Sequence, residues 1–296
     1  MTIYELIETP KTEIEQLVTT KIKQYRRFPI TKKSGKLRWL NEPSEALKQV
    51  QTKFLNNFLY KFKTHPIAVG FRRNISVKEG AKRHFGNKTL LNIDLRGFFD
   101  SVTASMVLPE MIKRLHSYNN QHTLEWDEAD ARLLTSLITL NGALPQGSPT
   151  SPAMANLVCY KMDIDLQDFA KQNKLIVTRY ADDISFSHLS KRYPLLDHII
   201  EITKMVQKYH FKLNYKKTRI MRPHRRMSVT GIVINDKYGI PKYKRKIFRA
   251  ILHQKRNVDI TEREYQQLRG YAEWIRFLNP EQGQKFIDEI AKMNVV

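Results

Sequence analysis

Three aspartates in apolar surroundings are the residues of this chain that most clearly suggest catalytic chemistry. Asp182 and Asp183 are adjacent within KLIVTRYADDISFSH (174–188), a segment that predicts two strands around a tight turn. Asp94 lies at the end of the apolar run KTLLNIDL (88–95), which predicts a neighbouring central strand. Adjacent carboxylates resist joint ionisation, and a divalent cation would relieve their repulsion. Since successive strand side chains point to opposite faces, only a turn can aim both aspartates at one site.

Three such carboxylates suit a pair of Mg²⁺ ions, with Mn²⁺ as an alternative. Two metal ions about 3.5–4 Å apart are the arrangement that proteins use for in-line phosphoryl displacement. One ion would activate a primer hydroxyl, and the other would hold a triphosphate and its pyrophosphate leaving group. The alternative interpretation of the Asp182-Asp183 pair is an ordinary solvated turn. The pair is therefore ambiguous until the other motifs are considered.

The charge of the chain predicts a polyanionic partner. Lysine and arginine number 51 against 29 aspartates and glutamates, a formal net charge of +22 that is spread along the whole chain. Such an excess favours nucleic acid and fast, salt-sensitive association. An anionic membrane surface is a lesser alternative, because no strongly amphipathic basic helix stands out. A basic protein without any such partner is the third interpretation.

The rest of the composition predicts a cytoplasmic protein with no membrane partner. Cys159 is the only cysteine, which excludes an intrachain disulfide and disfavours a zinc site. No apolar run approaches the roughly 18 residues needed to span a bilayer. The N-terminus is acidic and lacks the basic region of a signal peptide.

The pattern of elements predicts an α+β fold, with acid-bearing strands, helices behind them and more helices at the end. Helices are expected from Thr9-Pro10 to Tyr25, after a cap at Ser44, over 151–169, over roughly 191–209 and after a capping box of Thr261 and Glu264. A short hairpin is expected in TKKSGKLRWLNEP (31–43), and single strands are expected in FKLN (211–214) and SVTGIVIN (228–235).

Five motifs give the chain a resemblance to the reverse transcriptase family. In chain order they are NIDLRGFFDSV (92–102), LPQGSPTSPAMANLV (144–158), RYADDISFS (179–187), FKLNYKKTRI (211–220) and VTGIVIN (229–235). They resemble the first catalytic acid motif, the motif that positions template and nucleotide, the paired-aspartate motif and the two elements that follow it. The resemblance implies an RNA-directed DNA polymerase shaped like a right hand. Fingers and a palm, an antiparallel sheet backed by helices, would occupy residues 1–235, and a helical thumb would occupy 236–296.

The resemblance also implies roles for residues inside these motifs. Asp94, Asp182 and Asp183 would be the catalytic metal ligands, and Gln146 would lie against the incoming nucleotide. Phe99 falls where the family has the ring that excludes a ribose 2′-hydroxyl and so selects deoxynucleotides. Packing in the core is the alternative for both Phe98 and Phe99.

Basic residues are expected to handle the phosphates of the dNTP. Arg38, in the fingers-like hairpin, would hold them bidentately, a task that suits a guanidinium group. Three lysines of the same hairpin could help: Lys32, Lys33 and Lys36. Lys217 is the candidate for protonating or neutralising pyrophosphate, with Lys216 as the alternative.

A narrower resemblance is to the bacterial retron reverse transcriptases. Val229-Thr230-Gly231 is similar to a signature of that group, and LRGYAEWIRF (268–277) resembles its thumb. Another signature is Asn-Ala-x-x-His ahead of the first acid motif, and here Gly80 stands in place of the asparagine while His84 matches. The resemblance implies that His84 and the Val229-Thr230-Gly231 segment contact RNA or primer. The alternative for His84 is a packed, hydrogen-bonded histidine.

The retron resemblance implies a specific function. The enzyme would bind its own structured noncoding RNA, prime from a guanosine 2′-hydroxyl and copy part of that RNA into branched RNA–DNA (msDNA). It would act in antiphage defence with a separate effector protein. Its basic residues would line the cleft and the thumb, among four aromatic residues: Tyr243, Tyr265, Tyr271 and Trp274. Packing in the thumb core is the alternative for these aromatics, and it is expected for more of them than base stacking is. Two alternatives stay open: another small bacterial reverse transcriptase, of abortive-infection or diversity-generating type, and a non-catalytic RNA-binding scaffold.

Overall fold

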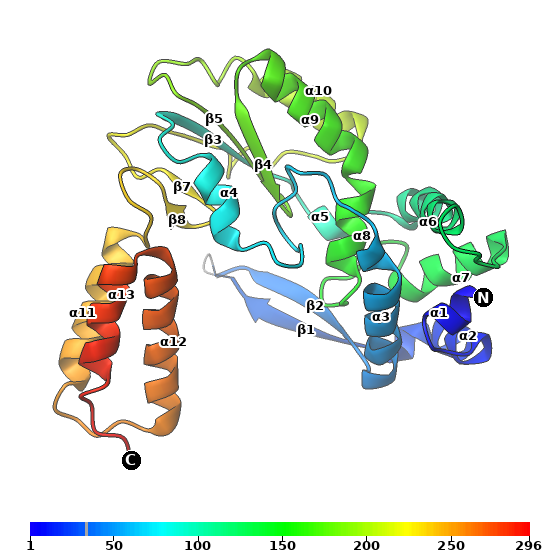
Figure 1. The fold of residues 1–296 in the computed structure, drawn as a ribbon, viewed down its shortest axis with the longest axis horizontal. Helices are drawn as coiled ribbons and strands as arrows, with labels where there is room; N and C mark the ends of the chain where they lie inside the picture. The colour runs from blue at the N-terminus through cyan, green and yellow to red at the C-terminus, as the bar shows by residue number, and fades with distance from the viewer. Residues whose placement is uncertain (33–34) are drawn as a thin grey trace.

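The computed structural model describes residues 1–32 and 35–296, and it has a sheet-containing body beside a separate group of three helices (Figure 1). The helices of the body are α1 (Ile3–Leu6), α2 (Lys11–Thr19), α3 (Glu45–Asn57), α4 (Val77–Arg83), α5 (Phe98–Ser101), α6 (Ala104–Asn119), α7 (Glu128–Ile138), α8 (Ser151–Val158), α9 (Tyr160–Gln172) and α10 (Ile199–Lys208). The separate group contains α11 (Lys242–Lys255), α12 (Glu262–Leu278) and α13 (Pro280–Ile290). The strands are β1 (Tyr25–Thr31), β2 (Leu37–Pro43), β3 (Thr89–Asp94), β4 (Ile176–Tyr180), β5 (Asp183–His188), β6 (Arg219–Met221), β7 (Ser228–Val229) and β8 (Ile232–Val233).

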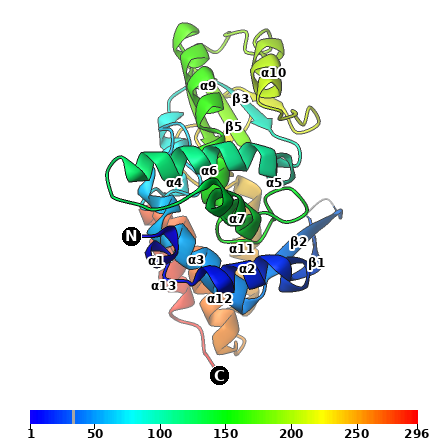
Figure 2. The same ribbon diagram turned by 90° about the vertical axis from the view of Figure 1, so that its right-hand side faces the viewer.

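The central sheet has the strand order β4-β5-β3-β6, and every neighbouring pair in it is antiparallel. Five of the six residues of β3 are buried, as expected for a central strand whose two faces are both covered. Helices α9 and α10 lie together against one side of the sheet, and α6 crosses the body below them (Figure 2). The antiparallel sheet with helices behind it agrees with the expected α+β architecture.

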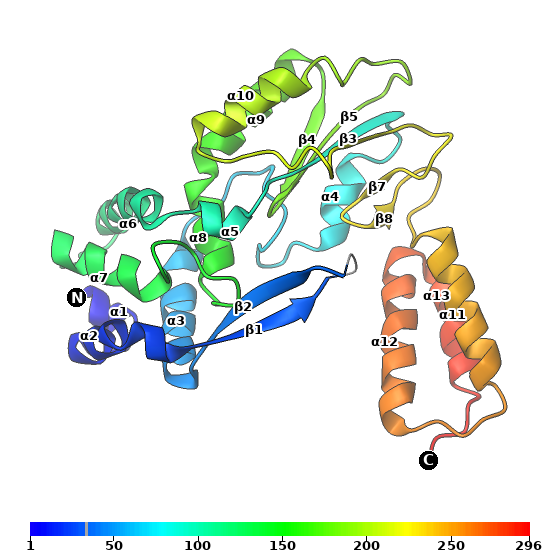
Figure 3. The ribbon, with the colours of Figure 1, turned by 180° about the vertical axis from the view of Figure 1, so that it is seen from behind.

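The β1–β2 hairpin is longer than expected, with seven paired positions from Tyr25–Pro43 to Thr31–Leu37. It extends from the body toward the side where α12 lies (Figure 3). The expected helix up to Tyr25 is therefore wrong. Helix α2 ends at Thr19, where three successive β-branched residues (18–20) disfavour further helix, and a 3₁₀ turn over Lys21–Gln24 leads into the first strand.

Four other segments differ from their expected structure. The helix expected over 151–169 is divided at Cys159 into α8 and α9. The helix expected from about 191 begins only at Ile199, after the turns that follow Pro194. FKLN (211–214) makes one isolated bridge, Leu213 to Leu95, and the strand that pairs with β3 is β6. SVTGIVIN (228–235) is not one strand, because its centre turns back on itself to form the β7–β8 hairpin.

Helices α11–α13 enclose a second apolar core, in which Phe248 contacts Tyr271 and Phe286 edge to face. The capping box of Thr261 and Glu264 is present at the start of α12, as expected. Gly283 allows α13 to approach α12 closely, because a Cβ at that position would lie 2.1 Å from the Cα of Arg276. The same core includes Val229 of β7, Ile232 of β8 and Leu90 of β3, so it continues to the central sheet.

Candidate active site

The three aspartates meet at one edge of the central sheet. Asp94, the last residue of β3, is directly opposite Asp183, the first residue of β5. The turn between β4 and β5 is held to the end of β3, since Leu95 N–H donates to the carbonyl of Asp182 at 2.9 Å. Ala181 within this turn has a left-handed backbone with φ +54°, which is uncommon for a residue other than glycine. The register and the turn thus bring the predicted acids together.

Asp94 is buried, with 6% of its surface exposed, and both of its carboxylate oxygens have partners. Asn214 Nδ2 donates to Oδ1 at 2.9 Å, and Lys217 Nζ lies 2.6 Å from Oδ2. The backbone of Asn214 also donates to the Asp94 carbonyl at 2.8 Å. The Lys-Lys-Thr loop is therefore docked on the first acid, with Lys217 rather than exposed Lys216 turned toward it. Asn214 was not anticipated from the sequence, where its only signal is its place in the FKLNYKKTRI motif.

The negative charge of the paired aspartates is only partly compensated by nearby cations. Burial against the surrounding protein, followed by the charges of Asp182 and Asp94, raises the pKa of Asp183 to about 6, although part of its side chain is exposed. Burial and the Asp94 charge likewise raise the pKa of Asp182, while Lys217 and Arg38 act in the opposite direction. The site therefore resists full ionisation without a bound cation.

The donor set of this site fits a hard divalent cation, because carboxylate oxygens are the ligands that Mg²⁺ and Mn²⁺ prefer. No group of three acidic, histidine or cysteine side chains within residues 1–32 and 35–296 is already arranged as a metal cage. The Lys217 ammonium occupies one carboxylate oxygen of Asp94 in this arrangement. The observation that fits a cation here is the position of Asp94 directly opposite Asp183, and the raised pKa of Asp183 agrees with it.

Residues proposed to bind the nucleotide lie on the hairpin and on the Leu-Pro-Gln-Gly turn. Arg38 is exposed on β2, and its positive charge is one of those that lower the pKa of Asp182. Lys32 and Lys36 are exposed at the hairpin end, whereas Lys33 lies outside the described residues.

The Gln146-Gly147 turn is joined directly to the hairpin. Asn41 N–H on β2 donates to the Gln146 carbonyl at 2.8 Å. Gly147 has φ +126°, and a Cβ on it would lie 2.5 Å from the Asn41 carbonyl oxygen. Only glycine permits this close approach, which holds the partly buried Gln146 next to the hairpin.

Aromatic rings lie beside Tyr180 of the catalytic turn and in the core behind it. Phe98 is buried and stacks on Phe211 at 5.7 Å, so it packs in the core. Phe99 is only partly buried, and Phe71 lies 6.3 Å from it and 5.8 Å from Tyr180, ring centre to ring centre. Phe71 was not anticipated from the sequence. It is 40% exposed and has φ +58°, a strained conformation for an aromatic residue that is often found near functional sites.

His84 is fully buried in the body and does not face a surface. Its Nδ1 lies 2.6 Å from the Ser187 hydroxyl and its Nε2 lies 2.7 Å from the Thr178 hydroxyl. Burial lowers the pKa of His84 to about 3, so the ring is neutral. Both ring nitrogens are thus used inside the protein, which corresponds to the packed, hydrogen-bonded alternative. Nearby Gly80 has no room for an asparagine, because even a Cβ would lie 2.9 Å from Val69 Cγ2.

The Val229-Thr230-Gly231 segment forms the tip of the β7–β8 hairpin. Thr230 and Gly231 have φ +49° and φ +86°, and positive φ at both central residues matches the right-handed twist of a hairpin. Val229 is buried in the second core, while Gly231 is exposed. A β-branched threonine is costly in this backbone conformation, which marks the tip as a strained position.

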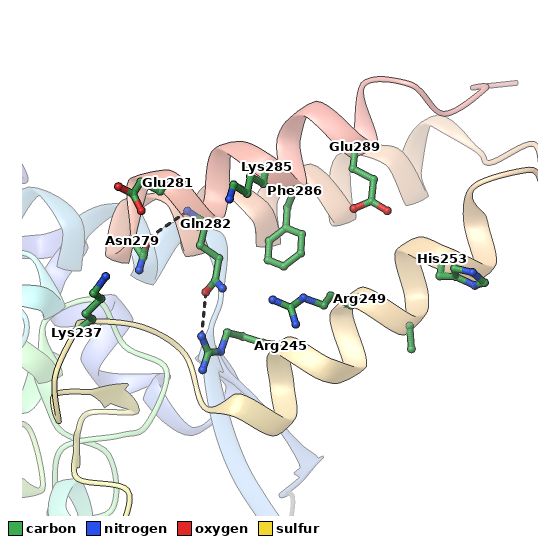
Figure 4. A pocket seen from close by; sticks show the side chains of 11 residues that line it. Lys237, Arg245, Arg249, His253, Asn279, Glu281, Gln282, Lys285, Phe286 and Glu289 are labelled. Atoms are coloured by element: carbon green, nitrogen blue, oxygen red, sulfur yellow. Dashed lines mark hydrogen bonds between the residues drawn. The ribbon is translucent and has the colours of Figure 1, made fainter. Parts of the chain in front are cut away.

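A basic groove of about 810 Å³ lies between α11 and α13 (Figure 4). Four cationic side chains and two glutamates are part of its lining: Lys237, Arg245, Arg249, Lys285, Glu281 and Glu289. Arg245 also lines a neighbouring groove of about 620 Å³ with Arg225, Arg226 and Lys242, and its Nε is buried without a hydrogen-bond partner among the described residues. Part of the positive charge of the chain thus lines a concave surface here.

Two of the four aromatic residues expected near these basic residues are mainly packing residues. Tyr265 and Tyr271 pack against the second core. Tyr243 and Trp274 are exposed by 52% and 36%, and Trp274 stacks on Phe277. Of the four, Tyr243 and Trp274 are the ones that offer ring surface to a nucleic acid.

Comparison with known protein families shows which family the chain belongs to. Residues 30–234 match the family described as "Reverse transcriptase (RNA-dependent DNA polymerase)". The chain belongs to the reverse transcriptase family, and it is an RNA-directed DNA polymerase.

Curated relatives are retron enzymes, which supports a retron-type reverse transcriptase. The retron Ec86 reverse transcriptase of Escherichia coli is 31% identical over 98% of this chain and 89% of its own. The retron Mx65 reverse transcriptase of Myxococcus xanthus is 32% identical over 90% of this chain. The retron Mx162 reverse transcriptase of the same organism is 30% identical over 91%. The matches span 64% and 61% of these two Myxococcus enzymes, which is less than two thirds of their length.

Solved structures confirm the right-hand fold. An apo telomerase from Candida tropicalis, truncated from its C-terminal domain, matches 76% of this chain and 59% of its own with a TM-score of 0.52 at 13% identity. Another apo telomerase structure from that organism matches 91% of this chain and 56% of its own, with a TM-score of 0.51 at 10% identity. None of the helices in the described part of the chain has the length and apolar character required to cross a membrane.

Proposed function

We propose that this polymerase copies part of its own structured noncoding RNA into branched RNA–DNA, primed from a guanosine 2′-hydroxyl. The observation that carries the proposal is the pairing of Asp94 with Asp183 at the sheet edge, in a chain similar to the Ec86 enzyme over nearly its whole length. The RNA, the branched product and dNTPs would be its partners in the cytoplasm. A separate effector protein would complete an antiphage system.

Asp94, Asp182 and Asp183 are the proposed catalytic residues, and they would hold two Mg²⁺ ions, with Mn²⁺ as a substitute. When bound, the ions would acidify the primer hydroxyl and neutralise the charge on the triphosphate. The protein itself orients the reactants. Arg38 reaches from the hairpin to the triphosphate, and its planar guanidinium suits two phosphate oxygens at once.

Three other side chains complete the proposed nucleotide site. Gln146 borders the incoming nucleotide from the turn that is tied to the hairpin. Phe99 lies under the sugar and excludes a 2′-hydroxyl by steric contact. Lys217 can leave Asp94 and deliver its proton or its charge to the pyrophosphate, which makes it the proposed general acid.

We further propose that residues 1–235 form fingers and palm and that residues 236–296 form the thumb. The groove between α11 and α13 would bind RNA phosphates through Arg245, Arg249 and Lys285. The strained Val229-Thr230-Gly231 tip would contact the RNA near the primer. His84 would not contact the RNA directly, because its ring nitrogens are bonded to Ser187 and Thr178, and it would instead hold the end of α4 against the central sheet.

The test is DNA synthesis by the protein purified with its copurifying RNA. With dNTPs and Mg²⁺, we expect a covalently branched product that survives phenol extraction and is resolved by a debranching enzyme. Asp182→Asn combined with Asp183→Asn should abolish synthesis while the protein remains folded. Full synthesis by that variant would contradict the proposal. One defined copurifying RNA supports the retron assignment, whereas a mixture or none would favour another small reverse transcriptase.

A further inference from the structure

A fully buried ion pair lies directly beneath the catalytic turn. Arg179, the residue before Tyr180, and Asp163 on α9 both have fully buried side chains. Arg179 Nε donates to Asp163 Oδ1 at 2.6 Å, and Nη2 donates to Oδ2 at 2.6 Å. This bidentate arrangement satisfies both carboxylate oxygens and fixes the plane of the guanidinium group.

The remaining guanidinium nitrogen connects the pair to the turn. Arg179 Nη1 donates to the Ala181 carbonyl at 3.3 Å and to Asn156 Oδ1 at 3.1 Å. Asn156, on α8, in turn donates from Nδ2 to the carbonyl of Gly70 at 2.9 Å. Gly70 packs against Ala181 so tightly that a Cβ on it would lie 3.1 Å from the Ala181 nitrogen. Ala181 is therefore held by Arg179 on one side and by Gly70 on the other.

A contribution to stability alone does not explain this arrangement. Burying two charges costs so much desolvation energy that well-packed apolar residues often serve a fold equally well. The buried pair also reaches Ala181 through Arg179 Nη1, and the left-handed backbone of Ala181 persists only because its surroundings impose it. The direction of the Asp182 side chain depends on this residue, since a strand without such a turn would send Asp182 and Asp183 to opposite faces.

We propose that Arg179 is a positioning residue that fixes the catalytic turn, and that Asp163 and Asn156 hold Arg179 in place for this task. The proposal rests on the catalytic role of Asp182 and Asp183 proposed above. Arg179 touches neither substrate nor reacting atoms. Its effect is exerted through the Ala181 carbonyl and should therefore be seen in the rate of the chemical step rather than in substrate binding.

The decisive experiment distinguishes an effect on the stability of the fold from an effect on the position of the catalytic turn. Arg179→Met combined with Asp163→Leu replaces the ion pair with apolar side chains and leaves no unpaired buried charge. We expect a thermal unfolding temperature close to that of the wild type, an unchanged KM for template and primer, and a kcat lower by about 10²-fold, as for small misplacements of catalytic groups. A stable double variant with full kcat would overturn the proposal.

Two further variants keep the test decisive if the double variant does not fold. Arg179→Lys keeps a cation next to Asp163 but cannot bond to Asn156 and Ala181 at the same time. Asn156→Ala leaves the ion pair intact and removes the two bonds that Asn156 makes, one from Arg179 Nη1 and one to the Gly70 carbonyl. Both are expected to remain folded with reduced kcat, and full activity of both would overturn the proposal.

The control is another internal ion pair. Arg114→Met with Glu110→Leu removes a pair that lies on α6, outside the catalytic turn, with side chains that are 11% and 13% exposed. This variant should keep its kcat. Asp182→Asn with Asp183→Asn, measured in parallel, tests the catalytic assignment separately. If that variant retained activity the proposed function would fail, whereas an active Arg179→Met, Asp163→Leu variant would refute only the positioning role.

Discussion

Lys217 Nζ forms an ion pair with Asp94 Oδ2 at 2.6 Å, although the lysine is largely exposed and the aspartate is buried. The lysine thus has the reach to contact the acid and also to swing toward a leaving group. Lys217→Met should lower kcat by about 10²-fold, the usual contribution of a positioned proton donor. Single-nucleotide incorporation kinetics would measure this change. Lys216→Met is the matched control, and an equal loss for both variants would contradict the assignment.

The raised pKa of Asp183 links the catalytic site to stability. The carboxyl titrates near pH 6 in the folded chain and near 3.8 ordinarily, so the folded state binds more protons between these values. Stability without metal should therefore fall as the pH rises from about 4 to above 6. Asp183→Asn should remove this loss and stabilise the protein at pH 7.5, by on the order of 1 kcal/mol after allowance for solvent screening.

Thermal unfolding without divalent metal, at pH 7.5 and at pH 4, would test this effect. The difference between Asp183→Asn and the wild type should shrink at the lower pH, where the wild-type carboxyl is protonated. A variant that is less stable than the wild type at pH 7.5 would contradict the expected sign.

Phe99 and Phe98 should respond differently to the same truncation. Phe99→Ala should weaken the preference for dNTPs over rNTPs by about 1–3 kcal/mol, because the shorter side chain leaves room for a 2′-hydroxyl. Phe98→Ala should leave the preference unchanged and destabilise the fold by roughly 3–5 kcal/mol, because Phe98 is buried. Ratios of kcat/KM for paired nucleotides, together with urea unfolding, would separate the two roles.

Neutral His84 should make the fold sensitive to acid. Its pKa is near 3 in the folded state and 6.5 ordinarily, so only the unfolded chain binds a proton between these values. The stabilisation is complete above pH 6.5 and should be lost on acidification, with a slope of up to about 1.4 kcal/mol per pH unit. Urea unfolding of His84→Gln should lack this component, while exposed His122→Gln should behave like the wild type.

The groove between α11 and α13 should determine much of the salt dependence of RNA binding. Replacing Arg245 and Arg249 by glutamate should weaken binding and reduce the slope of log K against log salt by about 1 for each phosphate that the groove no longer neutralises. The comparison is Arg132→Glu, an exposed charge reversal on α7. Equal reductions in affinity for the two variants would indicate a non-specific effect of net charge.

The acid-bearing strands were predictable because their signal is local: a short apolar run ending in an acid, or two runs around a turn. Segments whose structure depends on distant partners were not. FKLN (211–214) alternates like a strand, yet the adjacent edge of β3 is taken by β6. SVTGIVIN (228–235) has the composition of one strand, but Thr230 and Gly231 both take positive φ and reverse the chain.

The candidate site was predictable to a similar extent. Asp94, Asp182 and Asp183 have a chemical signature in the sequence, and the register brings them together. The role of Arg179 beneath them was hidden, because its partner Asp163 is 16 residues away on a helix and has the sequence context of an ordinary surface charge. Nothing in a linear sequence reveals that both side chains are shielded completely from water.

The close approach of Gly147 to Asn41 has a mechanical consequence. The hairpin carrying Arg38 cannot slide at Asn41 without drawing the Gln146 backbone with it, because a hydrogen bond and close packing join them there. The hairpin is thus fixed to the Gln146-Gly147 turn at Asn41. A bend between Asn41 and the hairpin end would therefore move Arg38, while Gln146 stays bonded to Asn41.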